Sequence, residues 1–283
     1  GPVIVDSKTG SSYRVNVASG GNPNLKPQIS ATRSFGVIWE PKSEVLKGFR
    51  FNFERFEIQQ KDSIATLSAQ EMVDIEGLPA VAGRIVRDPT TKLITNLDLT
   101  ALNYAENVSS GYDVSAAYRK NTSAGVFNFN AGGTVMQIYE RSTAGGELAS
   151  YLGFVNRSGV AKHKANAGLN WSRHGWRLSW NTIYFGSYQQ NGAPGDPLGA
   201  ARFVVTMGGT TIPAQQSHSF RASYDFGRKE DRSRLLAGMS VTLGINNVFD
   251  RAPAFDPYYG NFMSSPYLSQ SGREWWLRVK KTF

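Results

Sequence analysis

The stretch AGMSVTLGIN, residues 237–246, decides the fold class. Apolar side chains occupy every second position, and small or polar residues stand between them. Such alternation puts the two sets on opposite faces of an extended strand, whereas a helical face would repeat every 3.6 residues. We therefore expect a β-strand with one apolar and one polar face. Its apolar face carries Ala237, Met239, Val241, Leu243 and Ile245.

The same period of two recurs along the chain in both directions from this stretch. No long segment shows helical periodicity, so the sequence predicts an all-β fold. Nine strands are expected, over about residues 29–39, 49–58, 112–118, 127–135, 165–171, 176–184, 217–226, 237–245 and 275–283.

Strand length and connection length together favour a membrane barrel over a soluble sandwich. Several predicted strands run to about 11–13 residues, whereas a membrane-crossing strand needs about 9–11 and a soluble strand usually has about 5–6. Short turns alternate with long loops, as they do when turns are periplasmic and loops extracellular. The short connections cover about 41–48, 120–124, 172–175 and 227–234, and the long ones about 60–107, 138–160, 189–215 and 248–271.

Large aromatic residues gather beside the short turns and the C-terminus. On the barrel interpretation they share one height, as a girdle of aromatic side chains at a membrane interface would. Ordinary core packing of aromatic residues is the alternative. The predicted girdle consists of Trp39, Phe49, Tyr118, Trp171, Trp176, Phe226 and Phe283.

Composition excludes several other classes of protein. The 283 residues carry a net charge of +9, but the densest basic cluster, residues 228–234, is mixed in sign and predicts a solvated turn rather than a nucleic-acid site. The absence of cysteine excludes disulfides, thiolate metal sites and a cysteine nucleophile. No apolar run is long enough for a membrane helix, and the N-terminus does not read as a signal peptide.

The strand count predicts that the chain is part of a larger barrel. If the last strand ends at the periplasmic rim, the first strand, near Ile29, begins outside. Bacterial barrels normally have an even number of strands, and an open sheet edge in lipid leaves backbone groups unpaired. We therefore expect the edges near 29–40 and 271–283 to be open or paired with strands from elsewhere.

Four segments, in order, carry a resemblance to a known family. They are Gly21–Pro27 ahead of the first strand, Ser110–Asp113 at the start of a returning strand, Ile245–Arg251 at a strand exit, and the C-terminal Gly272–Phe283. From about Gly21 onwards the chain resembles the C-terminal half of the barrel of TonB-dependent outer-membrane receptors. Gln28 replaces the usual acidic residue, and Lys281 an apolar one.

The resemblance implies part of a 22-stranded barrel in the outer membrane. It implies residues 1–28 as an extracellular loop and 29–283 as barrel strands. It also implies a plug domain, further strands and contact with the TonB complex, none of which this sequence contains. Outer-membrane lipid is then the other partner, and active import of a scarce solute of the siderophore, vitamin or carbohydrate class the function.

No catalytic, metal or cofactor site is predicted. His163, His174 and His218 match no ligand spacing, and no nucleophile elbow or phosphate-binding loop occurs. Tyrosine and amide side chains in the long loops are candidates for ligand contact, and anchoring of tyrosine at the outer interface is the alternative. The candidates are Tyr184, Tyr188, Gln189, Gln190, Asn191, Tyr258, Tyr259, Asn261 and Tyr267. Two other functions stay open, a passive porin-like or structural barrel component and a soluble all-β carbohydrate-binding module.

Overall fold

The computed structural model describes residues 1–142, 147–154, 159–189, 209–227, 236–255 and 271–282. The chain divides into two compact units, and several long strands contribute residues to both. The first unit comprises Gly1–Arg33, Glu57–Ser110 and Ile138–Ser150, and the second Ser34–Phe56, Gly111–Gln137 and Tyr151–Phe283.

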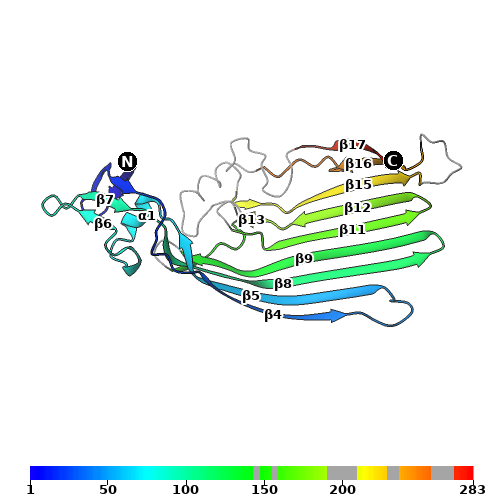
Figure 1. The fold of residues 1–283 in the computed structure, drawn as a ribbon, viewed down its shortest axis with the longest axis horizontal. Coiled ribbons are helices and arrows are strands. Elements are labelled where there is room, and N and C mark those ends of the chain that lie inside the picture. Colours follow the sequence, from blue (N-terminus) through cyan, green and yellow to red (C-terminus); the bar gives the residue numbers. More distant parts are fainter. Residues whose placement is uncertain (143–146, 155–158, 190–208, 228–235, 256–270, 283) are drawn as a thin grey trace. The chain divides into compact units, whose positions relative to one another are not determined.

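One large sheet contains all nine predicted strands (Figure 1). A short strand, β10 (Leu148–Ser150), also pairs with β9. Every neighbouring pair from β9 to β17 is antiparallel, which confirms the predicted all-β antiparallel fold. The nine strands are β4 (Ile29–Trp39), β5 (Phe49–Ala65), β8 (Leu102–Thr122), β9 (Gly125–Ser142), β11 (His163–Arg173), β12 (Trp176–Phe185), β15 (Gln215–Asp225), β16 (Met239–Asn246) and β17 (Glu274–Lys281).

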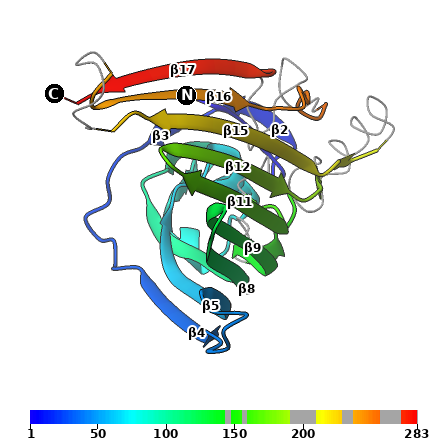
Figure 2. The same cartoon turned by 90° about the vertical axis from the view of Figure 1, so that its right-hand side faces the viewer.

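The order of strands in this sheet follows the chain from β4 to β17. Figure 2 shows the strands following one another around an arc, with β4 and β17 at its two ends. Within the described residues these two end strands do not pair with each other. The predicted open edges are therefore confirmed.

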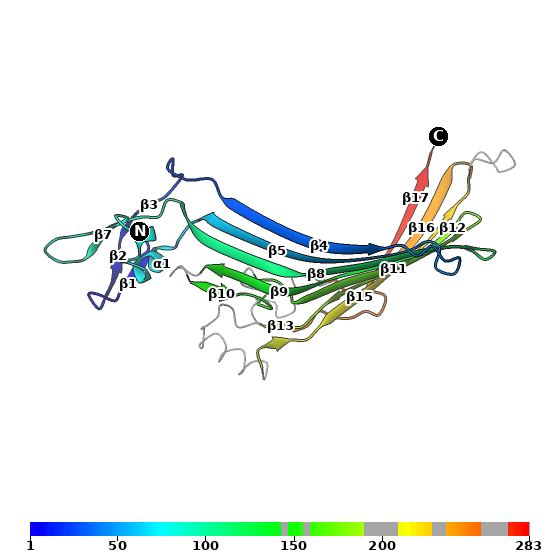
Figure 3. The same cartoon turned by 90° about the horizontal axis from the view of Figure 1, so that it is seen from below.

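Short turns join successive strands at one end of the sheet (Figures 1 and 3). Arg173 pairs with Trp176, so His174 and Gly175 form a two-residue hairpin with φ of 47° and 86°. Positive φ at both positions is the type I′ geometry, whose twist matches that of the flanking strands. At the same end, Thr282 donates a backbone hydrogen bond to Gly238 at 2.9 Å, so β17 ends beside the start of β16.

The first unit also contains a small folded region made of short elements. Strand β1 pairs with β2, and β3 pairs in parallel with β7, which also pairs with β6. Ser68 caps α1 through a reciprocal capping box with Glu71, a motif that satisfies two backbone donors at a helix start. The elements are β1 (Val3–Asp6), β2 (Ser11–Arg14), β3 (Asn16–Ala18), α1 (Ala69–Asp74), the 3-10 helix η1 (Pro79–Val81), β6 (Ile85–Arg87) and β7 (Ile94–Asp98).

A hydrophobic core joins residues 1–18 to residues 67–102 in this region. Segments expected as loops thus hold short strands and a helical turn, because side chains from both segments bury one another. Their position outside the membrane stays a prediction. The core residues are Ile4, Val15, Leu67, Ala69, Met72, Val73, Ile75, Val81, Ile94, Leu97 and Leu102.

A buried ion network lies in the same region. Arg87 donates two hydrogen bonds to the fully buried Asp6, at 2.7 and 3.1 Å, and two to Glu76. Tyr13 donates to Asp6 at 2.7 Å. The Arg87 hydrogen bonds hold the pKa of Asp6 well below its ordinary value and lower that of Glu76 in the same way, against the opposing effect of burial.

Candidate functional site on the polar face of the sheet

The register of the large sheet sorts its side chains into one apolar face and one polar face. Directly opposed residues on neighbouring strands have the same character, so the apolar positions form rows that cross the sheet. One such row runs from β17 to β9 through Leu277, Leu243, Ala222, Leu178, Trp171 and Phe127.

The apolar face is exposed. Leu277 is 66% exposed, Trp275 61% and Leu243 44%. Soluble monomers rarely leave a continuous apolar surface over several strands without a partner. Contact with a lipid or protein surface is the physical explanation for such a face.

The polar face carries small and amide side chains in its centre. Gly168 on β11 pairs with Asn130 on β9 and with Asn181 on β12. A Cβ at Gly168 would lie 2.7 Å from Asn130 Oδ1 and 3.1 Å from Asn181 Oδ1. The two carboxamides therefore lie against the glycine between them. Asn166 and Asn170 add amides on the same face of β11.

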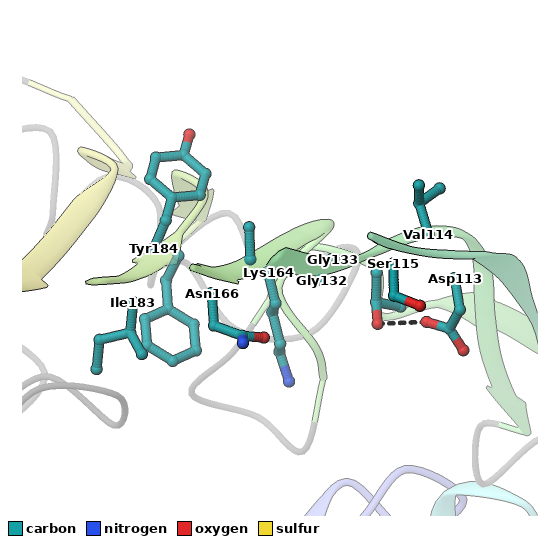
Figure 4. A pocket seen from close by; sticks show the side chains of 12 residues that line it. Asp113, Val114, Ser115, Gly132, Gly133, Lys164, Asn166, Ile183 and Tyr184 are labelled. Atoms are coloured by element: carbon teal, nitrogen blue, oxygen red, sulfur yellow. Dashed lines mark hydrogen bonds between the residues drawn. The ribbon is translucent and has the colours of Figure 1, made fainter. Parts of the chain in front are cut away.

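A shallow hollow of about 380 Å³ opens beside this amide-rich area, around Gly132 and Gly133 (Figure 4). Asp113, Lys164 and Asn166 point to one side of the sheet there, and Val114 and Tyr184 to the other. Thr134 donates a hydrogen bond to Asp113 at 2.5 Å. The polar side of the hollow thus offers both hydrogen-bond donors and hydrogen-bond acceptors.

The candidate ligand residues within the described chain do not converge on this hollow as a group. Tyr184 is 37% exposed and lies on the apolar side, where the predicted alternative, anchoring at an interface, fits its position. Tyr188 is buried on the short strand β13 (Tyr188–Gln189), which pairs with β14 (Thr211–Ile212). Gln189 holds Thr210 and Thr211 by side-chain hydrogen bonds of 2.9 and 3.0 Å. Gln190, Asn191, Tyr258, Tyr259, Asn261 and Tyr267 lie outside the described residues.

The described members of the predicted aromatic girdle lie at or near the ends of the strands, beside the short turns. Trp39 contacts Phe49 at 5.8 Å between ring centroids, and Phe49 contacts Tyr118 at 6.3 Å. Tyr224 on β15 contacts Trp176 on the neighbouring β12 at 4.9 Å, and it contacts Phe226, which directly follows β15, at 4.8 Å.

Two further aromatic residues, Trp171 and Tyr224, lie near the short-turn end of the sheet. Trp171 donates its indole hydrogen to the carbonyl of Ala124 in a short turn. The prediction omitted Tyr224, although it falls on the apolar parity of its strand, two residues before Phe226. Phe283 lies outside the described residues, and a role at the membrane interface stays a prediction.

The described residues contain no group of three or more His, Asp or Glu side chains arranged to hold a metal ion. In the same residues, no helix has the length and apolarity needed to cross a bilayer.

Long antiparallel strands, short turns at one end and two chemically distinct faces define a class of protein, the outer-membrane type of β-barrel. A family model described as "TonB dependent receptor-like, beta-barrel" matches residues 6–248. The chain belongs to this family. A search of curated protein sequences finds no match.

Solved structures of similar fold include two receptors and an iron transporter. The siderophore receptor PirA of Acinetobacter baumannii has a TM-score of 0.58 at 15% identity, over 94% of this chain and 33% of its own. The ferric enterobactin receptor PfeA of Pseudomonas aeruginosa, as a Q482A mutant with enterobactin, has a TM-score of 0.59 at 14% identity, and the match covers 97% of this chain and 34% of PfeA. The FrpB iron transporter of Neisseria meningitidis, F3-3 variant, has a TM-score of 0.54 at 15% identity, and the match covers 92% of this chain and 32% of FrpB. The chain thus spans about a third of the length of the structures it matches.

Proposed function

We propose that this chain forms the C-terminal part of a TonB-dependent receptor that imports a scarce solute across the outer membrane. The observation that carries the proposal is the exposed apolar face, with aromatic side chains along its short-turn end, in a member of this family. On this proposal the apolar face contacts lipid and the polar face lines the lumen. The rest of a longer protein supplies the plug domain, the remaining strands and the contact with the TonB complex.

The solute is of the siderophore, vitamin or carbohydrate class. Iron chelates are the first to test, because the similar solved structures include a siderophore receptor and a ferric enterobactin receptor. A passive porin-like barrel is the alternative, favoured by the hydrogen-bonding, mostly uncharged centre of the polar face. A soluble carbohydrate-binding module would have to cover side chains such as Leu277 and Trp275, which are exposed.

The test is uptake by the full-length protein in its host cell. A strain carrying the gene should accumulate a radiolabelled chelate, vitamin or oligosaccharide, and deletion of its tonB gene or collapse of the proton-motive force should abolish the accumulation. Uptake that persists without TonB would identify a passive pore. Membrane fractionation provides the check on location, since the full-length protein should appear in detergent-extracted outer membrane with heat-modifiable gel mobility.

A further inference from the structure

An aromatic side chain and two arginines meet on the polar face of the last three strands. Trp276 on β17 lies opposite Gly244 on β16, which in turn lies opposite Arg221 on β15. The Cζ atom of Arg221 lies 5.9 Å from the centre of the Trp276 ring, and that of Arg278 lies 5.5 Å from it. Both distances fall within the range of cation–π contact.

Gly244 lets the indole lie across β16. A Cβ at this position would lie 2.1 Å from Cε2 and 2.2 Å from Cζ2 of Trp276. No side chain tolerates such distances, so the ring occupies the space that any other residue would fill. The glycine thereby lets the Trp276 ring reach toward Arg221, two strands away.

The two guanidinium groups have no acidic partner among the described residues, and both arginines are exposed. The nearest acids in sequence on the same face are engaged elsewhere. Asp225 accepts a hydrogen bond from the backbone of Gly227 and forms an ion pair with Arg177 at 4.0 Å. Glu274 accepts a hydrogen bond from Asn246 at 3.4 Å. Within the described part of the chain, no acidic side chain therefore compensates the positive charge of the pair.

We propose that Arg221, Arg278 and Trp276 form a binding site for a planar anion, an aromatic carboxylate or phenolate carried by the transported solute. Guanidinium groups bind carboxylates through charge-assisted, often bidentate hydrogen bonds. The indole provides a flat surface for the ring of the same ligand. The assignment to a transported solute rests on the proposed function, whereas the anion site itself follows from these three side chains.

The experiment is a fluorine NMR titration of the full-length protein in detergent with 4-fluorobenzoate. Neutral 4-fluorobenzamide and non-planar cyclohexanecarboxylate, added as a competitor, separate the contributions of charge and ring. We expect saturable binding of 4-fluorobenzoate and at least tenfold weaker binding of the other two. Loss of one charge-assisted hydrogen bond corresponds to about tenfold in affinity, so Arg221→Gln and Arg278→Gln should each weaken binding by about that factor.

Two further variants test the geometry. Gly244→Ala leaves both arginines in place but displaces the indole, so it should also weaken binding. Arg177→Gln is the matched control, because it removes an exposed guanidinium of the same face that is already paired with Asp225, and it should leave binding unchanged.

Several results would overturn the site. They are equal affinity in the wild type and an Arg221→Gln, Arg278→Gln double variant, unchanged affinity in Gly244→Ala, and absence of saturable binding by the wild type. Absence of saturable binding is the result expected if a carboxylate from another part of the same protein already pairs with the two arginines. Failure of the proposed function is distinguishable, because loss of TonB-dependent uptake leaves this titration unaffected.

Discussion

Trp275 and Trp276 are adjacent in sequence and lie on opposite faces of the same strand. Trp275 belongs to an apolar row with Ile245 and Phe220, and is 61% exposed. Trp276 lies on the polar face against Gly244 and two arginines. The same residue type therefore serves two environments, and only its parity along the strand decides which. A one-residue shift of register would exchange them.

Arg87 decides the stability of the small region built from residues 1–18 and 67–102. Replacing Arg87 by methionine keeps most of its volume but leaves Asp6 buried without its positive partner. Breaking a buried pair in this way costs about 3–5 kcal/mol. Hydrogen exchange of the peptide covering residues 3–14, in the full-length protein, should lose protection accordingly. Arg14→Met, which removes an exposed arginine that bonds the carbonyl of Gly1, should have little effect.

The same network predicts how the stability of this region depends on pH. Asp6 and Glu76 have lowered pKa values because Arg87 donates hydrogen bonds to their charged forms. Below the ordinary carboxyl pKa of about 4, the unfolded chain binds more protons than the folded one, so stability falls as the pH falls. Protection of residues 3–14, corrected for the intrinsic exchange rate, should be constant from pH 6 to 5 and decline towards pH 3. A decline that persists in full in Arg87→Met would contradict this origin.

At the scale of the single strand, the proposed function puts lipid on the apolar face of β16 and the lumen on its polar face. Leu243 lies one row deeper than Val241, whose row includes the rim residues Trp176 and Tyr224. Arginine on the lipid side costs about 2–4 kcal/mol near mid-bilayer and about 0–1 near the interface. Leu243→Arg should therefore destabilise more than Val241→Arg, and Thr242→Arg, on the polar face, should cost about 1 kcal/mol or less. Urea unfolding in lipid vesicles measures all three, and equal costs would reject the facing assignment.

The hairpin between β11 and β12 depends on Gly175. Its φ of 86° is a left-handed conformation, and a Cβ there would lie 2.6 Å from the carbonyl oxygen of Asp225. The conformation alone costs about 1–2 kcal/mol for a residue with a side chain, so Gly175→Ala should lower the folded fraction seen by heat-modifiable mobility. His174→Asn is the matched change, because asparagine tolerates positive φ better than most residues, and it should not reduce that fraction.

The long elements could be predicted from sequence, and the short ones could not. A strand such as Met239–Asn246 shows its period over many residues, and its facing follows from the alternation. The strands β1, β2, β3, β6 and β7 of the small folded region have three to five residues, too few to show a period. The partner of β3 is also distant in sequence, since Val17 pairs with Leu97. One local signal was present, because Ser68 and Glu71 form a capping box ahead of the buried Met72 and Val73.

In the candidate site, too, the sequence predicted some features and not others. Alternation assigned Asn130, Asn166 and Asn181 to the polar face of their strands. It gave them no function, because the position of a residue on a face does not identify a ligand. The meeting of Arg221 with Trp276 depends on the registers of three strands, which no single strand encodes. Tyr184 was a ligand candidate by residue type, and its parity with Thr182 and Trp180 was the signal that it lies on the apolar face.

For the whole molecule, the decisive question is what pairs with its two edge strands. All eleven residues of β4 are exposed, and β17 carries exposed Leu277 and Val279. Unpaired backbone groups on such edges invite pairing with other chains, and in lipid each costs several kcal/mol. We therefore expect the 283-residue chain, refolded alone in detergent, to give heterogeneous or aggregated β-structure, whereas the full-length protein gives one heat-modifiable monomer.

Cysteine cross-linking tests the same point directly, because the chain has no cysteine of its own. Leu243 and Leu277 lie opposite each other on β16 and β17, so cysteines at these two positions should cross-link under mild oxidation and serve as the positive control. Cysteine at Val37 of β4 should cross-link with none of Trp275, Leu277 or Val279 in the monomer, because β4 and β17 stand at opposite ends of the strand order. If β17 closed directly onto β4, side chains on the same face would alternate every second residue. One of the three positions would then lie close to Val37, and a cross-link there would mean that nine strands close into a barrel by themselves.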